Sequence, residues 1–109
     1  MAAGAKVVVI YPKPQDETAF EEEYKNVHLP MVEQKLKGIN RLVTTKILSS
    51  PQGETRSYRM AELHFSSMDA LNACLQTEGA KEVMEHAKEI STGGAPILMI
   101  AEEETRVFW

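Results

Sequence analysis

The sequence has few of the features that would place it in several familiar classes of protein. It has one cysteine, Cys74, which excludes a disulfide within the chain and is typical of a reducing cytoplasm, where we expect the protein to reside. Cys74 has no basic neighbour within a helical turn, so nothing predicts an activated thiolate. No apolar run approaches the roughly 20 residues that span a bilayer. The first residues, MAAGAK, lack a hydrophobic signal region, so we expect neither a membrane partner nor export.

Several common binding motifs are also missing. The net charge is -4, and Lys and Arg do not cluster as they would along a phosphate backbone, so we expect no nucleic-acid partner. There is no P-loop, no dinucleotide-binding glycine fingerprint and no Cys-x-x-Cys, and the TGG at 92–94 is too short to indicate phosphate binding. We therefore expect chemistry that needs no cofactor and no metal ion.

What is present is a clear alternation of strand and helix patterns in a chain of 109 residues, enough for one domain over 1–109. The expected elements are strands at 6–12, 39–50, 55–67 and 97–109 (the last with a tail) and helical regions from 19 to 37 and from 66 to 90. Expected N-caps are Asp16, Ser66 in a capping box with Asp69, and Thr77 after a break. The β-α-β-β-α-β order predicts an α+β, ferredoxin-like fold with a four-stranded antiparallel sheet.

Both faces of this predicted sheet carry apolar residues. Right-handed crossovers place both helical regions on one face, so the other face should be polar. In the first and last strands, however, residues of both parities are apolar: Val7, Val8, Val9, Ile10 and Tyr11, then Ile97, Leu98, Met99 and Ile100. A second copy would cover the surplus face, so we expect a homodimer packed sheet against sheet. We also expect the apolar end of the chain, 107–109, to pack across the dimer, the alternative being that it docks on its own domain.

The stretch YKNVHLPMV, at 24–32, puts a proline inside the first helical region. The apolar face there recurs at spacings of three and four: Phe20, Tyr24, Val27, His28 and Met31. Because Tyr24 and His28 are four residues apart, their side chains should stack on this face, toward the sheet. Pro30 removes an amide donor and should push Leu29 away from helical angles, at a cost of roughly 3 kcal/mol. We therefore expect a kink that opens space beside the helix.

YKNVHLPMV resembles the Tyr-x-x-x-His-x-Pro-hydrophobic signature of EthD-like proteins, which belong to the dimeric α/β-barrel superfamily. Three other stretches resemble the family in the same order: VVVIYPKPQDETAFEEEY, YRMAELHF and TEGAKEVMEHAKEISTGG. The resemblance implies a ferredoxin-like chain that dimerises through its sheets, with a cavity between helices and sheet in each subunit. The superfamily includes cofactor-free monooxygenases, polyketide cyclases, dehydratases, lactone isomerases and haem-degrading enzymes, so the fold alone does not select a reaction.

His28 is the residue to which we assign acid or base chemistry. A neutral imidazole in an apolar cavity can accept a proton from a phenol or a carbon acid, since its ordinary pKa is about 6.5. The alternative is a core histidine that bonds a backbone carbonyl. Tyr24 would orient the substrate through its hydroxyl. Candidate walls of the cavity are Tyr11, Met31, Leu63, Phe65, Val83 and Met84, each of which can also be explained as plain core.

The two other histidines receive different interpretations. Glu62 and His64 alternate with apolar residues along the third strand, so we expect them to face the dimer interface rather than the cavity. If Glu62 and His64 pointed instead to the face of the sheet that carries the helices, they would join His28 in the cavity. The three residues could then form a metal triad, which we consider the weaker interpretation. His86 stands among charged residues and is interpreted as a solvated position.

These inferences favour a cytoplasmic homodimer that acts without a cofactor on a small apolar compound, for instance a phenol or a quinone. Oxygenation, cyclisation, dehydration and decarboxylation all remain open as the reaction. Two alternatives come from other classes of protein. One is a non-catalytic carrier of a hydrophobic metabolite for a partner oxygenase, and the other is a haem-binding protein with His28 as the axial ligand.

Overall fold

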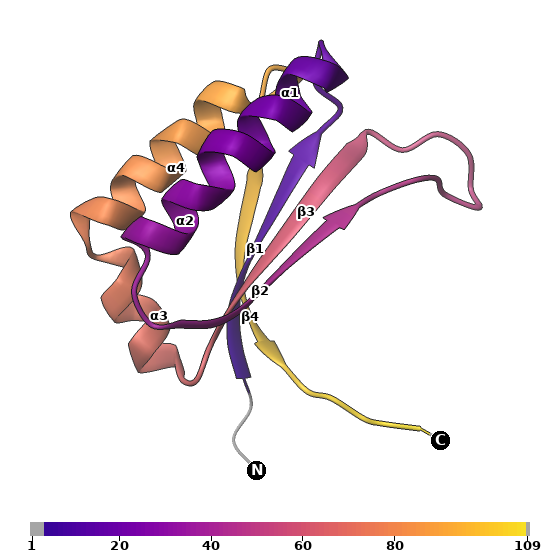
Figure 1. Ribbon diagram of the computed structural model, residues 1–109. Coiled ribbons are helices and arrows are strands. Elements are labelled where there is room, and N and C mark those ends of the chain that lie inside the picture. The colour runs from indigo at the N-terminus through magenta and orange to yellow at the C-terminus, as the bar shows by residue number, and fades with distance from the viewer. Residues whose placement is uncertain (1–3, 109) are drawn as a thin grey trace.

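A computed structural model describes residues 4–108 and shows one four-stranded antiparallel sheet with helices packed on one of its faces (Figure 1). The elements in chain order are β1 (Gly4–Pro12), α1 (Glu17–Glu23), the π-helix η1 (Tyr24–His28), α2 (Leu29–Lys35), β2 (Ile39–Lys46), β3 (Ser57–Phe65), α3 (Met68–Leu75), α4 (Glu78–Ile90) and β4 (Ile97–Glu103). The strand order in the sheet is β2-β3-β1-β4. This is the ferredoxin-like fold that the sequence predicts.

The strands differ from the predicted ranges mainly at their ends. β1 begins at Gly4 rather than at residue 6, and β2 and β3 are shorter than expected at their shared loop. Residues 47–56 leave the ladder there, and the loop contains Gly53 with a φ of 117° and a bridge between Ser50 and Gly53. The β-branched residues of 39–50 favour a strand, so the predicted strand continues past Lys46, where β2 ends in the structure.

The helices begin at side-chain caps. Asp16 and Thr77 accept bonds from backbone N–H groups three residues on, at 3.0 and 3.1 Å, as predicted. The cap of α3 is Ser67, which accepts from the N–H of Ala70 at 3.1 Å, so the prediction of Ser66 is wrong by one residue. Both serines can cap, and the choice follows from the helical register that buries Leu71 in the core.

The first helical region keeps helical backbone angles at Leu29. Leu29 has helical angles, φ −62° and ψ −41°, and its N–H bonds the carbonyl of Tyr24 five residues back. The chain thus forms one wide π turn before Pro30, which then occupies the first turn of α2. A proline is tolerated at that position, because the N–H it lacks would have no partner in an isolated helix. The expected departure of Leu29 from helical angles is therefore wrong, and a π turn stands at this point instead.

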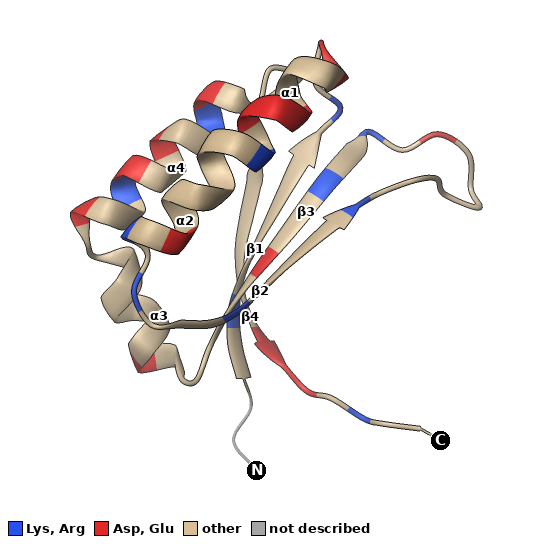
Figure 2. Ribbon diagram, in the orientation of Figure 1, with Lys and Arg blue, Asp and Glu red and all other residues tan. Residues whose placement is uncertain are grey.

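The hydrophobic core lies between the helices and one face of the sheet. Val7, Val9 and Tyr11 of β1 point into it, and Phe20, Tyr24 and the other buried helix residues close it from above. Figure 2 shows charged residues of both signs interspersed over the outer surfaces of α1, α2 and α4. Among residues 4–108, none of the helices has both the length and the apolar character required to cross a membrane.

The opposite face of the sheet is not covered by any helix of the described chain (Figure 1). Ile97 and Met99 of β4 lie on it and are 57% and 45% exposed. Val8 pairs with Met99 and Ile10 with Ile97, so the apolar residues form one continuous patch. Beyond β4 the chain extends away from the sheet with Phe108 exposed, and Trp109 of the predicted interface tail lies outside the described residues.

Candidate functional site

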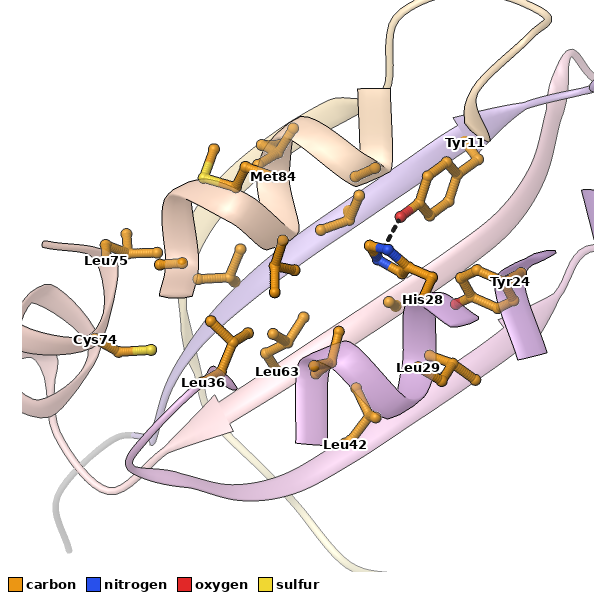
Figure 3. A pocket seen from close by; sticks show the side chains of 18 of the residues that line it. Tyr11, Tyr24, His28, Leu29, Leu36, Leu42, Leu63, Cys74, Leu75 and Met84 are labelled. Atoms are coloured by element: carbon orange, nitrogen blue, oxygen red, sulfur yellow. Dashed lines mark hydrogen bonds between the residues drawn. The ribbon is translucent and has the colours of Figure 1, made fainter. Parts of the chain in front are cut away.

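A largely apolar cavity of about 50 Å³ lies between the helices and the sheet (Figure 3). Five of the six predicted wall residues line it: Tyr11, Leu63, Phe65, Val83 and Met84. Tyr24 and His28 line it as well. Met31 does not and is half-buried against the core. The extra residue in the wide turn shifts the inward face, so the residues of α2 that reach the cavity are Leu29 and Val32.

His28 is buried at the end of the wide turn, with only 4% of its surface exposed. Its Nε2 lies 3.3 Å from the hydroxyl of Tyr11, a contact drawn in Figure 3. Its Nδ1 lies 2.9 Å from the Nδ1 of His86. The ring stacks on that of Tyr24 with a centroid distance of 5.9 Å. Both ring nitrogens therefore have side-chain partners, unlike those of a histidine bonded to a backbone carbonyl.

His86 is not a solvated position, and that interpretation is wrong. Its side chain is only 12% exposed, and its Nε2 lies 2.9 Å from Oε2 of Glu23. Its charged sequence neighbours suggested a surface site, but His86 falls three residues after Val83 and four before Ile90, both buried. That spacing is the signal that could have placed His86 at the edge of the apolar stripe of α4.

Burial favours the uncharged form of each ionisable group in the cavity wall. It lowers the pKa of His28 to about 4, with the neighbouring His86 contributing, so the imidazole is neutral near pH 7. Burial raises the pKa of the Tyr24 hydroxyl to about 12 and raises that of Tyr11 as well, so both phenols keep their protons. Burial also raises the pKa of the Cys74 thiol in the cavity wall, which disfavours the thiolate.

Tyr24 carries a buried hydroxyl that bonds no group among the described residues. Its ring stacks on Phe20 and lies 5.4 Å from the guanidinium of Arg59. Arg59 is itself held by Glu21, with Nε 3.0 Å from Oε2 and a second guanidinium nitrogen on Oε1. The sequence analysis did not single out this pair, whose members are 38 residues apart. Because neither Arg59 nor Glu21 bonds it, the Tyr24 hydroxyl is a polar group without a partner on a residue of the cavity wall, and a ligand could form a hydrogen bond with it.

Glu62 and His64 lie on the open face of the sheet, away from His28, so no metal triad forms with that residue. They instead meet Glu103, and the three side chains place ligand atoms within 4.8 Å of one another. The ammonium of Lys6 lies 2.6 Å from Oε1 of Glu62 and 3.4 Å from Glu103. A cationic side chain therefore already balances the charge that could hold a metal ion there.

Comparison with known proteins assigns the chain to a family. The model of the EthD domain matches residues 12–92. An uncharacterized 11.0 kDa protein in the thcB–thcC intergenic region of Rhodococcus erythropolis is 30% identical over 99 residues, which is 90% of this chain and 94% of that protein. An EthD family protein from Bacillus halodurans is 32% identical, with a TM-score of 0.84 over 93% of this chain and 99% of that one.

More distant structures share the fold alone. A dimeric ferredoxin-like protein of unknown function from Jannaschia is 13% identical, with a TM-score of 0.64 over 95% of this chain and all of that one (100%). A hydroxynitrile lyase from Passiflora edulis is 9% identical, with a TM-score of 0.72 over 95% and 96% of the two chains. The match to the EthD domain covers most of the sequence, including the helix that carries Tyr24 and His28, and the chain therefore belongs to the EthD family.

Proposed function

We propose that this protein is an enzyme that removes a proton from, or returns one to, a small apolar molecule in the cavity. The observation that carries the proposal is a neutral, buried histidine with one ring nitrogen directed into an apolar hollow, opposite the Tyr11 hydroxyl. In this reaction a phenolic O–H or an activated C–H bond of the substrate breaks and its proton joins Nε2 of His28. The substrate is left as an electron-rich anion.

The cavity gives the substrate its chemical class. Apart from Tyr11, Tyr24 and His28, its walls are apolar, so the bulk of the substrate is apolar and carries one or two polar groups. In this proposal the Tyr24 hydroxyl, which has no hydrogen-bond partner among the described residues, orients such a group. Phenols and quinones have this polarity, and the cavity of about 50 Å³ would widen to admit one of them. The resulting anion can then react with dioxygen, which supplies the oxygen atoms and accepts the electrons, or it can cyclise, dehydrate or lose carbon dioxide, in each case without a cofactor. Enzymatic chemistry does occur on this fold, as in the Passiflora hydroxynitrile lyase.

A carrier of a hydrophobic metabolite is the second candidate, and the apolar lining favours it equally. The two differ in the need for His28, because a carrier needs only the shape and apolarity of its cavity. Haem binding is a weaker reading of the site. A cavity of about 50 Å³ would have to open very widely to admit a molecule as large as a haem.

The experiment begins with mass spectrometry of the small molecule that co-purifies with the protein, followed by turnover assays in air and under nitrogen. We expect His28→Ala to lower turnover by at least about 100-fold, since general base catalysis contributes on that order. Met31→Ala is the matched control, because it shortens a half-buried side chain of the same helix outside the cavity. Full turnover by His28→Ala would refute the catalytic role, and a bound molecule that is never converted would favour the carrier.

The assembly that fits this function is a homodimer joined through the open face of the sheet. The apolar patch on β1 and β4 leaves Ile97 and Met99 about half exposed, and none of the described helices covers it. A second copy provides the same patch by two-fold symmetry. The exposed tail around Phe108 extends from the same strand and can cross to that copy. The Jannaschia protein, which shares the fold, is dimeric.

A further inference from the structure

Two hollows lie on opposite sides of the His28–His86 pair. His28 lines the inner cavity, whereas His86 and Glu23 line a groove of about 400 Å³ on the outer surface, between the start of α1 and the end of α4. Three contacts connect the two hollows. They run from the Tyr11 hydroxyl to Nε2 of His28 at 3.3 Å, between the two Nδ1 atoms at 2.9 Å, and from Nε2 of His86 to Glu23 at 2.9 Å.

With Glu23 ionised and both imidazoles neutral, the carboxylate at the outer end sets the direction of each of these three hydrogen bonds. An ionised carboxylate only accepts, so Nε2 of His86 must donate to Glu23. A neutral His86 then has an unprotonated Nδ1, which accepts from the Nδ1–H of His28. A neutral His28 in turn has an unprotonated Nε2, which accepts from the Tyr11 hydroxyl. The opposite assignment would place two acceptors against each other at Glu23.

We infer that His86 and Glu23 hold His28 in the tautomer with an unprotonated Nε2 in the cavity, and that they carry protons between His28 and the outer groove. The inference rests on the proposed role of His28 as the base. As the substrate proton joins Nε2, the Nδ1–H proton of His28 moves to Nδ1 of His86. The Nε2–H proton of His86 moves to the Glu23 carboxylate, which exchanges it with water. The reverse sequence returns a proton to the product and restores both tautomers.

The relay answers a difficulty created by burial. An imidazolium in the apolar cavity is unfavourable, which is the reason that burial lowers the pKa of His28 to about 4. Moving a proton outward at the other ring nitrogen lets His28 accept one without keeping the charge. Glu23 is 46% exposed, so the charge change occurs at a carboxyl group in contact with water. His86 and Glu23 act through His28 and are positioning residues.

The first test needs no substrate. In protein labelled with ¹⁵N-histidine, two-bond ¹H–¹⁵N correlations near neutral pH should show His28 protonated at Nδ1 and His86 protonated at Nε2. His86→Phe keeps an aromatic ring but removes the acceptor, so His28 should shift to the Nε2–H form. His86→Gln offers an amide oxygen in its place and should restore the Nδ1–H form. If His28 keeps Nδ1–H in His86→Phe, the positioning role is wrong.

The second test measures the relay itself, as the rate at which the Nδ1–H proton of His28 exchanges with water. Glu23→Gln and His86→Gln remove the groups that pass the proton outward, and each should slow exchange by about tenfold or more. Glu22→Gln, at the exposed neighbouring position, is the matched control and should leave exchange unchanged. Unchanged exchange in both Glu23→Gln and His86→Gln would overturn the relay, and these variants still decide the question if His86→Phe fails to fold.

These measurements separate the inference from the proposed function. A His28 tautomer held by His86 with no turnover of any molecule would leave the relay standing and refute the enzyme. Turnover that needs His28 but not His86 or Glu23, with unchanged proton exchange, would support the enzyme and refute the relay.

Discussion

At the scale of single residues, His28 is the side chain whose environment departs most from that of the free amino acid. It combines almost complete burial with two side-chain partners, and burial lowers its pKa to about 4 from an ordinary 6.5. The groups that face it are Tyr11 from β1, Tyr24 on its own turn, and the His86–Glu23 pair behind it. Because proton binding and folding are linked, this shift makes stability depend on pH.

We expect acid to destabilise the protein through His28. The unfolded chain binds this proton below about pH 6.5, whereas the folded chain resists it until about pH 4, so the contribution is complete above pH 6.5 and is lost between these values. The fully developed loss is at most about 3 kcal/mol. Urea unfolding near neutral pH and at about pH 4.5 should show a larger loss in the wild type than in His28→Phe, which keeps the ring stacked on Tyr24. Equal losses in both proteins would contradict this assignment.

At the scale of elements, the wide turn η1 decides what the first helical region presents to the sheet. It keeps Tyr24 and His28 inward and then shifts the face, so that Leu29 and Val32 rather than Met31 reach the cavity. The turn ends at His28, and Pro30 follows in the first turn of α2, where the missing N–H is tolerated. The proline and the apolar face are evident in the sequence, but a uniform α-helical period puts Met31 on the cavity side, whereas the π turn shifts it away.

Pro30→Ala tests whether the proline strains the helix. Since Pro30 stands in the first turn of α2, its replacement should change the free energy of unfolding by less than about 1 kcal/mol. The change should appear instead in the ring signals of His28, because alanine allows the wide turn to relax toward an α-helical one. Urea denaturation and histidine NMR measure the two effects. A stabilisation of about 3 kcal/mol would show that the proline is a strained interior residue after all.

At the scale of the whole molecule, the sheet separates two environments. One face closes the cavity with the helices, and the other presents an apolar patch beside a charged cluster of Lys6, Glu62, His64 and Glu103. In the proposed dimer the apolar patch and the charged cluster are both buried between the two copies, and the charged cluster would help to set their relative orientation. The cavity then lies on the other side of the sheet from the interface.

Met99→Glu should weaken this dimer without unfolding the subunit. The side chain is on the open face and already 45% exposed, so the charge is tolerated in the monomer but is buried at the interface. We expect the dimer dissociation constant to rise by at least about tenfold, which corresponds to 1.4 kcal/mol. Analytical ultracentrifugation measures it. Leu48→Glu, at an exposed position beyond β2, is the matched control and should leave it unchanged. An equal effect of both variants would place the interface elsewhere.

The sequence by itself determined the order of elements, the apolar faces and the pairing of Tyr24 with His28, because these depend on periods of two to four residues along one element. Only the tertiary structure decided the partners of His28. His86 is 58 residues away, and its side chain reaches His28 only when α4 packs beside η1. The meeting of Glu103 with Glu62 and His64 likewise depends on strand register, which no local pattern encodes. Packing thus placed His86 and Glu23 behind the predicted histidine, in a line of contacts that no pattern within one element encodes.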